Sequence, residues 1–501
     1  MSACASSGVP SLRVRVGNRM PANPDGRFVL YWMTACRRTG WNFGLQRAVD
    51  WARELARPLL VVEPLLSGGR WASDRRHRFV LDGMVDNGRQ FERYGVPYYP
   101  FVERAAGSAR ELLLALAPSA CVVIADDFPI AAVSESTISE PALPAAGQIP
   151  VLMEKVDSNG LLPPGAADRV FPTAYGFRRF LQRTLPDHLL DAPKANPLAR
   201  LSLPRLERLP AKITRRWPRA SSRLLSGGAA AMKSLPIDHD VPPVKTSGGA
   251  RAAERALKRF LDKKLPRYLD DRNQPEEDVT SGLSPHLHFG HISPQEIFHK
   301  IATQEDWSPP MLSGNATGSR EGWWGMSPAA EAFLDQLVTW RELGFNMSAG
   351  RSDYDRYESL PDWARKTLAD HSGDRREYLY SLEEFEHART HDPLWNAAQT
   401  ELRREGRLHN YLRMLWGKKI LEWSADPQEA LGVMVQLNNK YALDGEDPNS
   451  YSGIFWVLGR YDRPWGPERP IFGRIRYMSS QNAARKLRVR GYIEKYAPEV
   501  H

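Results

Sequence analysis

The feature that most constrains this chain's fold is a change in hydrophobic periodicity near residue 250. Before that point, short apolar runs typical of buried strands alternate with segments of helical spacing. The predicted strands are Arg27–Thr34, Pro58–Leu65, Val96–Val102, Ala120–Ala125 and Ile149–Val156, and the predicted helices are Phe43–Ala56, Arg75–Tyr94 and Ser108–Leu116. Such alternation is typical of a doubly wound parallel sheet. After residue 250 only helical spacing continues.

Four segments follow from this change of pattern. Residues 1–26, rich in Ser, Pro and Gly, are expected to form a loose leader. Residues 27–165 are expected to form an α/β domain, residues 166–250 a basic interdomain connection, and residues 251–501 a larger all-α domain. Within the connection, Leu201–Ser234 carries eight basic residues and one acidic residue. A solvated basic tether and a nucleic-acid contact are both compatible with that charge.

Several functional classes are excluded by missing patterns. The first predicted strand is followed by no GxGxxG, and the chain contains neither GxxxxGK[ST] nor GxSxG. No apolar run approaches the roughly 20 residues that a membrane helix needs, and the first 30 residues contain no apolar stretch typical of a secretory signal. The cysteines Cys4, Cys36 and Cys121 form no CxxC pair, so we expect no metal site. A reducing, cytoplasmic location is expected.

Two compositional features point to a partner. The formal net charge of +9 permits binding to a polyanion. Tryptophan accounts for 15 of the 501 residues, which suggests a site that uses indole rings.

The helical part contains five segments dense in aromatic and polar residues, each with a functional and a purely structural interpretation. The turn and helix start of Thr280–Ser293 suit an anion such as a pyrophosphate, or a capped helix with core histidines. Leu337–Met347 places Glu342 among aromatic residues, where burial demands a partner or ligand; a surface ion pair is the alternative. Arg469–Arg490 has seven basic residues and no acidic one, which indicates phosphate contacts or a solvated face.

The other two segments lie between these. In Leu408–Trp423, which follows Thr390–Asn396, Trp416 and Trp423 are seven residues apart and share one helix face; core packing would explain that spacing as well. In Leu437–Trp456 a helix ends in a turn that carries Asp444 and Asp447. A calcium loop is excluded because the EF-hand order of ligands is absent.

Taken together, SGLSPHLHFGHIS, HDPLWNAAQ, LHNYLRMLWGKKILEW, NNKYALDGEDPNSYSG and FGRIRYMS resemble segments of the DNA photolyases, specifically the class II cyclobutane pyrimidine dimer photolyases. The N-terminal YWMTACRRTGWNFGLQRAV is similar to the first sheet segment of the same class. The resemblance runs from about residue 27 to Tyr496. It implies an α/β antenna domain and a helical domain that binds FAD. The implied reaction is light-driven: excited reduced flavin donates an electron to the dimer, and the cyclobutane ring splits.

The resemblance implies FAD-binding roles for residues in the helical part. Asn438 matches an asparagine beside flavin N5, and Arg413 with Asp444 matches an ion pair flanking the isoalloxazine ring. The residues that match the phosphate and ribose side are Tyr268, Thr280, Ser281, Leu283 and Ser284.

Three tryptophans match the chain that photoreduces oxidised flavin in class II enzymes. In that match, Trp423 is expected nearest the flavin, Trp395 in the middle and Trp416 outermost.

For the lesion, the resemblance implies that Glu342 binds the carbonyl side of the dimer and that Met414 packs against it. Arg476 matches an arginine that fills the gap left in the duplex when the dimer flips out. The remaining pocket residues are expected to be Arg272, Asn273, Trp340, Tyr411 and Trp456.

The expected partner is damaged double-stranded DNA, bound by a monomer that needs no membrane. A second chromophore, a deazaflavin, is present in some class II members and absent from others, and no residue here decides between them. A cryptochrome-like photoreceptor without repair activity is the alternative function. The absence of a C-terminal extension beyond Tyr496, and the presence of Glu342, Met414 and Trp456, favour repair.

Overall fold

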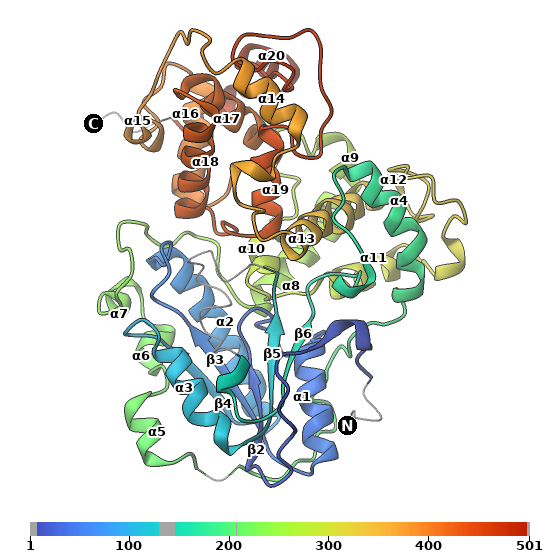
Figure 1. The fold of residues 1–501 in the computed structure, drawn as a ribbon, viewed down its shortest axis with the longest axis vertical. Coiled ribbons are helices and arrows are strands. Elements are labelled where there is room, and N and C mark those ends of the chain that lie inside the picture. The colour runs from blue at the N-terminus through green and yellow to red at the C-terminus, as the bar shows by residue number, and fades with distance from the viewer. Residues whose placement is uncertain (1–7, 130–145, 207, 498–501) are drawn as a thin grey trace. The chain divides into compact units, whose positions relative to one another are not determined.

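The computed structural model describes residues 8–129, 146–206 and 208–497, drawn as a ribbon in Figure 1. They divide into two compact units. The first unit contains the residues up to 168 together with 184–258 and 283–310, and the second contains 169–183, 259–282 and the residues from 311 onward. Among the described residues, no helix is long and apolar enough to cross a membrane.

The first unit is built on a six-stranded mixed sheet in the order β1-β6-β5-β2-β3-β4. Its strands are β1 (Val14–Val16), β2 (Phe28–Trp32), β3 (Leu59–Leu65), β4 (Tyr98–Val102), β5 (Ala120–Asp127) and β6 (Met153–Asp157). All neighbours are parallel except β1, which runs antiparallel to β6. The five predicted strands and the doubly wound arrangement are thus confirmed.

Alternate residues of β2 face two separate cores, as the two-residue period of a strand requires. Phe28, Leu30 and Trp32 pack on the side covered by α3 (Ser108–Leu116). Val29 and Tyr31 pack on the side covered by α1 (Phe43–Glu54) and the end of α2 (Asp74–Arg93). Because both faces are covered, all five residues of β2 are buried and none is charged.

The expected loose leader is partly ordered, and its first seven residues lie outside the described part. Strand β1 belongs to it, and the buried guanidinium of Arg13 donates to Asp157 at 2.6 Å. A strand of three residues is too short for its periodicity to be read from sequence.

The division into units also differs from the expected boundaries at 165 and 251. Most of the expected connection belongs to the first unit, and so do three helices expected in the all-α domain: α8 (Ala250–Arg259), α10 (Ser284–His288) and α11 (Pro294–Gln304). Gly290 explains part of this. It has a φ of 68°, and a Cβ there would lie 1.8 Å from the carbonyl oxygen of Ala35. Only glycine permits this close approach to the end of β2.

The remaining helices of the first unit lie in its basic segment. They are α5 (Ala211–Arg216), α6 (Ser222–Ser226) and α7 (Ala229–Met232).

The second unit is helical, as predicted. Its helices are α4 (Ala174–Thr184), α9 (Tyr268–Asp271), α12 (Pro328–Leu334), α13 (Arg341–Gly350), α14 (Asp362–Asp370), α15 (Leu382–Glu386), α16 (Pro393–Glu405), α17 (Asn410–Trp423), α18 (Pro427–Tyr441), α19 (Pro448–Val457), α20 (Ser480–Lys486) and α21 (Arg490–Lys495). Helix α17 packs against α16, α18 and α19, and Figure 1 shows this group in orange and red. It carries five of the expected site residues, which are Tyr411, Arg413, Met414, Trp416 and Trp423.

Candidate functional site

A polar group joins α17, α18 and the turn that follows α18. The Arg413 guanidinium donates to Asn438 Oδ1 at 2.8 Å, and its other nitrogen lies 3.8 Å from an oxygen of Asp444. The amide nitrogen of Asn438 donates to Ser450 Oγ at 2.8 Å, which fixes the orientation of the amide. The structure thus brings together the three residues expected beside the flavin ring.

The chemistry of this group fits a flavin. Asn438 is only 2% exposed, and its amide oxygen has a second lone pair beyond the one that Arg413 uses. Arg413 and Asp444 each keep a little under a fifth of their side chains exposed. A cation, an acceptor and a carboxylate are therefore available to the polar edge of a ring that carries both donors and acceptors.

The three predicted tryptophans form a buried cluster. Trp395 on α16 donates through Nε1 to the backbone oxygen of Trp416 at 3.0 Å. Its ring lies 6.0 Å, centroid to centroid, from the ring of Trp423. Trp395 therefore contacts both of the other two tryptophans; its middle position in an electron path stays a prediction.

Measured from Arg413, a residue expected beside the flavin, the two end tryptophans come in the opposite order to the expected one. Trp416 is one turn after Arg413 on α17, whereas Trp423 is ten residues after it, about 15 Å of helix rise. The ring of Trp423 contacts Tyr380, at 5.6 Å, and the exposed His391, at 5.0 Å. The cluster thus extends from the Arg413 group through Trp416 and Trp395 to Trp423 on the outer side.

A second aromatic group lies where α13 and α19 pack together. Trp340 and Trp456, both half-buried, stack with centroids 4.9 Å apart and an interplanar angle of 26°. Trp340 Nε1 donates to Asp335 at 3.2 Å, and Asp335 is held by Arg178 at 2.8 Å. Sequence reasoning missed this supporting pair because Arg178 lies in the segment that was expected to be a connection.

Three further residues expected at the lesion lie on α13 and α17. Glu342 on α13 is 4% exposed, so a surface ion pair is excluded for it. Gly344, two residues after it, packs so tightly on α19 that a Cβ would lie 2.8 Å from the Pro448 carbonyl oxygen. Tyr411 and Met414 are half-buried on the first turns of α17, which packs on α19.

The basic residues expected to contact DNA fall into two classes. Arg476 is exposed and lies over the ring of Trp465 at 5.1 Å, and Arg485 is also exposed. Arg488, by contrast, lies 2.9 Å from the carboxylate of Glu277. It is therefore a poorer phosphate contact than its position in the basic run suggested.

The residues expected at the flavin phosphates fall on both sides of a unit boundary. Tyr268, Thr280 and Ser281 belong to the second unit, and Leu283 and Ser284 to the first. Arg272 lies over the ring of Tyr268 at 5.6 Å, and Asn273 beside it is exposed. The assignment of these residues to FAD or lesion stays a prediction.

One charged residue in this region was not predicted. Lys418 on α17 is 1% exposed, one turn after Met414, and donates to the backbone oxygen of Val457 at the end of α19. Burial lowers the pKa of its amine to about 7. Sequence reasoning treated it as part of a basic outer face, since nothing in the helical spacing distinguishes a buried lysine from an exposed one.

We expect Lys418→Met to stabilise the protein by on the order of 1 kcal/mol at pH 7, because it replaces a buried cation with an apolar chain of similar length. Since the folded pKa is about 7 and the ordinary value is 10.5, the wild-type stability should rise with pH between those values. Thermal unfolding at pH 7 and pH 9 measures both effects. If the variant gains no stability at pH 7 and keeps the wild-type pH dependence, the lysine is not a buried titrating group.

Within the described residues, no group of histidine, cysteine, aspartate and glutamate side chains is arranged to hold a metal ion.

Comparison with known proteins gives a consistent result. No protein-family model matches the chain. The deoxyribodipyrimidine photo-lyase of Methanothermobacter thermautotrophicus is 33% identical over 487 residues, covering 96% of this chain and 97% of that protein. The deoxyribodipyrimidine photo-lyase of Oryza sativa is 33% identical over 494 residues, covering 96% and 89%. The fold is similar to the crystal structure of a bacterial class III photolyase from Agrobacterium tumefaciens, with a TM-score of 0.66 and 18% identity, covering 94% of this chain and 87% of that one.

Proposed function

The chain belongs to the photolyase and cryptochrome family, and on that premise we propose that it is a class II cyclobutane pyrimidine dimer photolyase. It repairs dimers in DNA by light-driven electron transfer from reduced FAD. The observation that carries this proposal is the arrangement around α17, which carries Arg413, Met414, Trp416 and Trp423. Asn438 of α18 and Trp395 of α16 are hydrogen-bonded to this helix.

Bound reduced FAD would supply, on absorbing light, the electron that splits the cyclobutane ring. Arg413, Asn438 and Asp444 would hold and orient the ring, with the free lone pair of Asn438 Oδ1 directed at a nitrogen that bears hydrogen. Trp416, Trp395 and Trp423, in that order outward, would deliver electrons from the protein surface to return the cofactor to its reduced state.

The lesion pocket would use the stacked pair Trp340 and Trp456 together with Met414. A flipped dimer leaves its stacking partners in the duplex at a cost of a few kcal/mol, which is smaller for damaged bases. Half-buried indole faces replace part of that stacking. Glu342, buried on the neighbouring turn, would have to act as a neutral carboxylic acid, whose O–H donates a hydrogen bond to the carbonyl edge of the dimer and so stabilises the negative charge that arrives on it.

A second chromophore would bind in the first unit, at the carboxyl ends of the strands, where open α/β sheets bind ligands. An absorption spectrum of the purified protein would show this chromophore as a band in addition to those of the flavin.

Arg476→Ala should weaken binding to dimer-containing duplex by about 1–3 kcal/mol, the effect of removing one stacking or base-edge interaction. Undamaged duplex contains no gap for this side chain to fill, so its affinity should change little. The matched control is Arg485→Ala, which should weaken both duplexes equally if that residue contacts phosphate. Binding is measured in the dark on two oligonucleotides that differ by one dimer, and an equal loss on both would make Arg476 an ordinary phosphate contact.

The proposed function is tested by illuminating the protein with duplexes that carry a cyclobutane dimer, a (6-4) photoproduct or no lesion. We expect restoration of the cyclobutane dimer alone. Restoration of the (6-4) photoproduct would assign a different lesion. Flavin photochemistry without restoration of either lesion would indicate a photoreceptor of the cryptochrome kind.

A further inference from the structure

The basic segment of the first unit is an ordered strap, which we define as residues 208–233. Its apolar side chains point inward: Ile213 and Trp217 join the core beneath α3, and Leu224 is buried. Its seven basic side chains are all exposed, and the strap contains no carboxylate. These cations are Arg208, Lys212, Arg215, Arg216, Arg219, Arg223 and Lys233. The strap is therefore not a loose tether, because its fold directs all of its charge to solvent.

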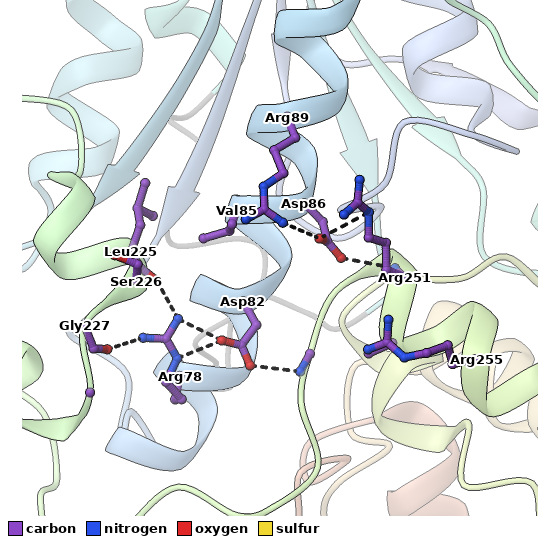
Figure 2. Close-up of a pocket in the computed structure, with 13 residues that line it drawn as sticks. Arg78, Asp82, Val85, Asp86, Arg89, Leu225, Ser226, Gly227, Arg251 and Arg255 are labelled. Atoms are coloured by element: carbon purple, nitrogen blue, oxygen red, sulfur yellow. Dashed lines mark hydrogen bonds and ion pairs between the residues drawn. The ribbon is translucent and has the colours of Figure 1, made fainter.

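Residues 225–228 of the strap line a pocket that Figure 2 shows between this segment, α2 and α8. The pocket has a volume of about 510 Å³. Arg78 joins its walls by donating to the carbonyl oxygens of Leu225 and Gly227, each at 2.6 Å, and by pairing with Asp82 at 2.8 Å. Each of these contacts joins Arg78 to another part of the protein, so this arginine holds the walls of the pocket together.

Three other arginines of the pocket share little negative charge. Arg89 and Arg251 lie 4.0 and 3.9 Å from the same carboxylate, that of Asp86. Arg255 on α8 points into the pocket (Figure 2) and is exposed, with no carboxylate partner in the part of the chain that the structure describes. The pocket is thus lined by four arginines and by two carboxylates, of which Asp82 pairs with Arg78 and Asp86 is shared by Arg89 and Arg251.

We propose that this pocket and the strap together form a binding surface for the phosphodiester backbone of DNA. A planar guanidinium matches the geometry of phosphate, with two parallel hydrogen bonds. The cations do not stop at the pocket but continue along the strap, which favours an extended polyanion over a single small phosphorylated ligand. The surface goes beyond the proposed repair activity, because contacts to phosphate are indifferent to the presence of a lesion.

The test compares three sets of substitutions in the full-length protein. The pocket set is Arg89→Gln, Arg251→Gln and Arg255→Gln, and the strap set is Arg215→Gln, Arg219→Gln and Arg223→Gln. The control set is Arg19→Gln, Arg53→Gln and Lys194→Gln, which removes the same charge from exposed positions of the first unit outside the surface. The strap set breaks no ion pair with Asp86, so it remains informative if the pocket set is unstable.

Binding of undamaged duplex is measured in the dark at several salt concentrations. Both test sets should weaken binding and reduce the slope of log affinity against log salt by about 0.9 for each phosphate that the variant no longer neutralises. The control set should keep the parental slope, and all sets should keep the parental preference for dimer-containing DNA.

Parental slopes in both test sets would overturn the proposal. So would tight binding of inorganic pyrophosphate that the pocket set abolishes while duplex binding is unchanged, which would indicate a small-anion site. Neither binding measurement depends on light or on repair. These experiments therefore test the DNA-binding surface even if the protein repairs no dimers.

Discussion

Replacing Trp395 by phenylalanine is expected to abolish the photoreduction of oxidised flavin while leaving repair by chemically reduced protein nearly intact. Trp395 is the middle member of the cluster, since its Nε1 binds the Trp416 backbone and its ring contacts Trp423. Phenylalanine fills most of the same volume, but it is a much poorer electron donor than an indole. Absorbance of the flavin under blue light with an external reductant measures the first effect.

The matched control for this experiment is Trp323→Phe. Trp323 is also a buried tryptophan of the second unit, and its ring packs against Trp324 instead of against the cluster. Trp423→Phe should likewise prevent stable photoreduction, because it removes the member that contacts Tyr380 and the exposed His391. Normal photoreduction in the Trp395 variant would refute the assignment of the electron path.

The second large effect is expected for Glu342→Gln, which should lower the number of dimers repaired per absorbed photon by about tenfold. This factor is smaller than the loss of rate that usually follows the removal of one preorganised hydrogen-bond donor from an active site. FAD content should stay at the wild-type level, because Glu342 lies on α13 and not among the three residues assigned to the flavin ring. Quantum yield and bound flavin are measured on the same preparation.

Glu331→Gln provides the control, because Glu331 is an equally buried carboxylate of the second unit with a structural role. It accepts hydrogen bonds from backbone N–H groups, including those of Gly322 and Gly325. Its replacement should affect stability more than yield per photon. An unchanged yield in the Glu342 variant would make that residue structural as well.

The sheet could be predicted from sequence because both of its faces are covered. Strands β2 to β5 are mainly apolar runs separated by helices of amphipathic spacing, and these strands and β6 overlap the ranges that the sequence predicted. Strand β1 was missed because three residues show no period. The division into units could not be predicted, since it depends on contacts between segments far apart in sequence, such as that of Gly290 with Ala35.

In the candidate site, too, the contacts between distant segments could not be predicted from the sequence. The residue types and the helices that carry them follow from the sequence and its resemblance to a known family. The order of the tryptophans along α17 relative to Arg413 was expected in reverse, because a match of motifs gives identities and not distances. Lys418 and the Arg178–Asp335 pair could not be found at all, since burial of a charged side chain depends on partners from other helices.

Above all, we propose that this protein uses light to split cyclobutane dimers with its reduced cofactor. The most direct measurement takes chemically reduced, oxygen-free protein in excess over a duplex that carries one thymine dimer. Half of the sample is exposed to blue light and half is kept in the dark, and the intact thymines are then quantified. We expect restoration of the thymines in the illuminated sample only. Equal amounts of dimer in both samples, with flavin bound and reduced, would contradict this function.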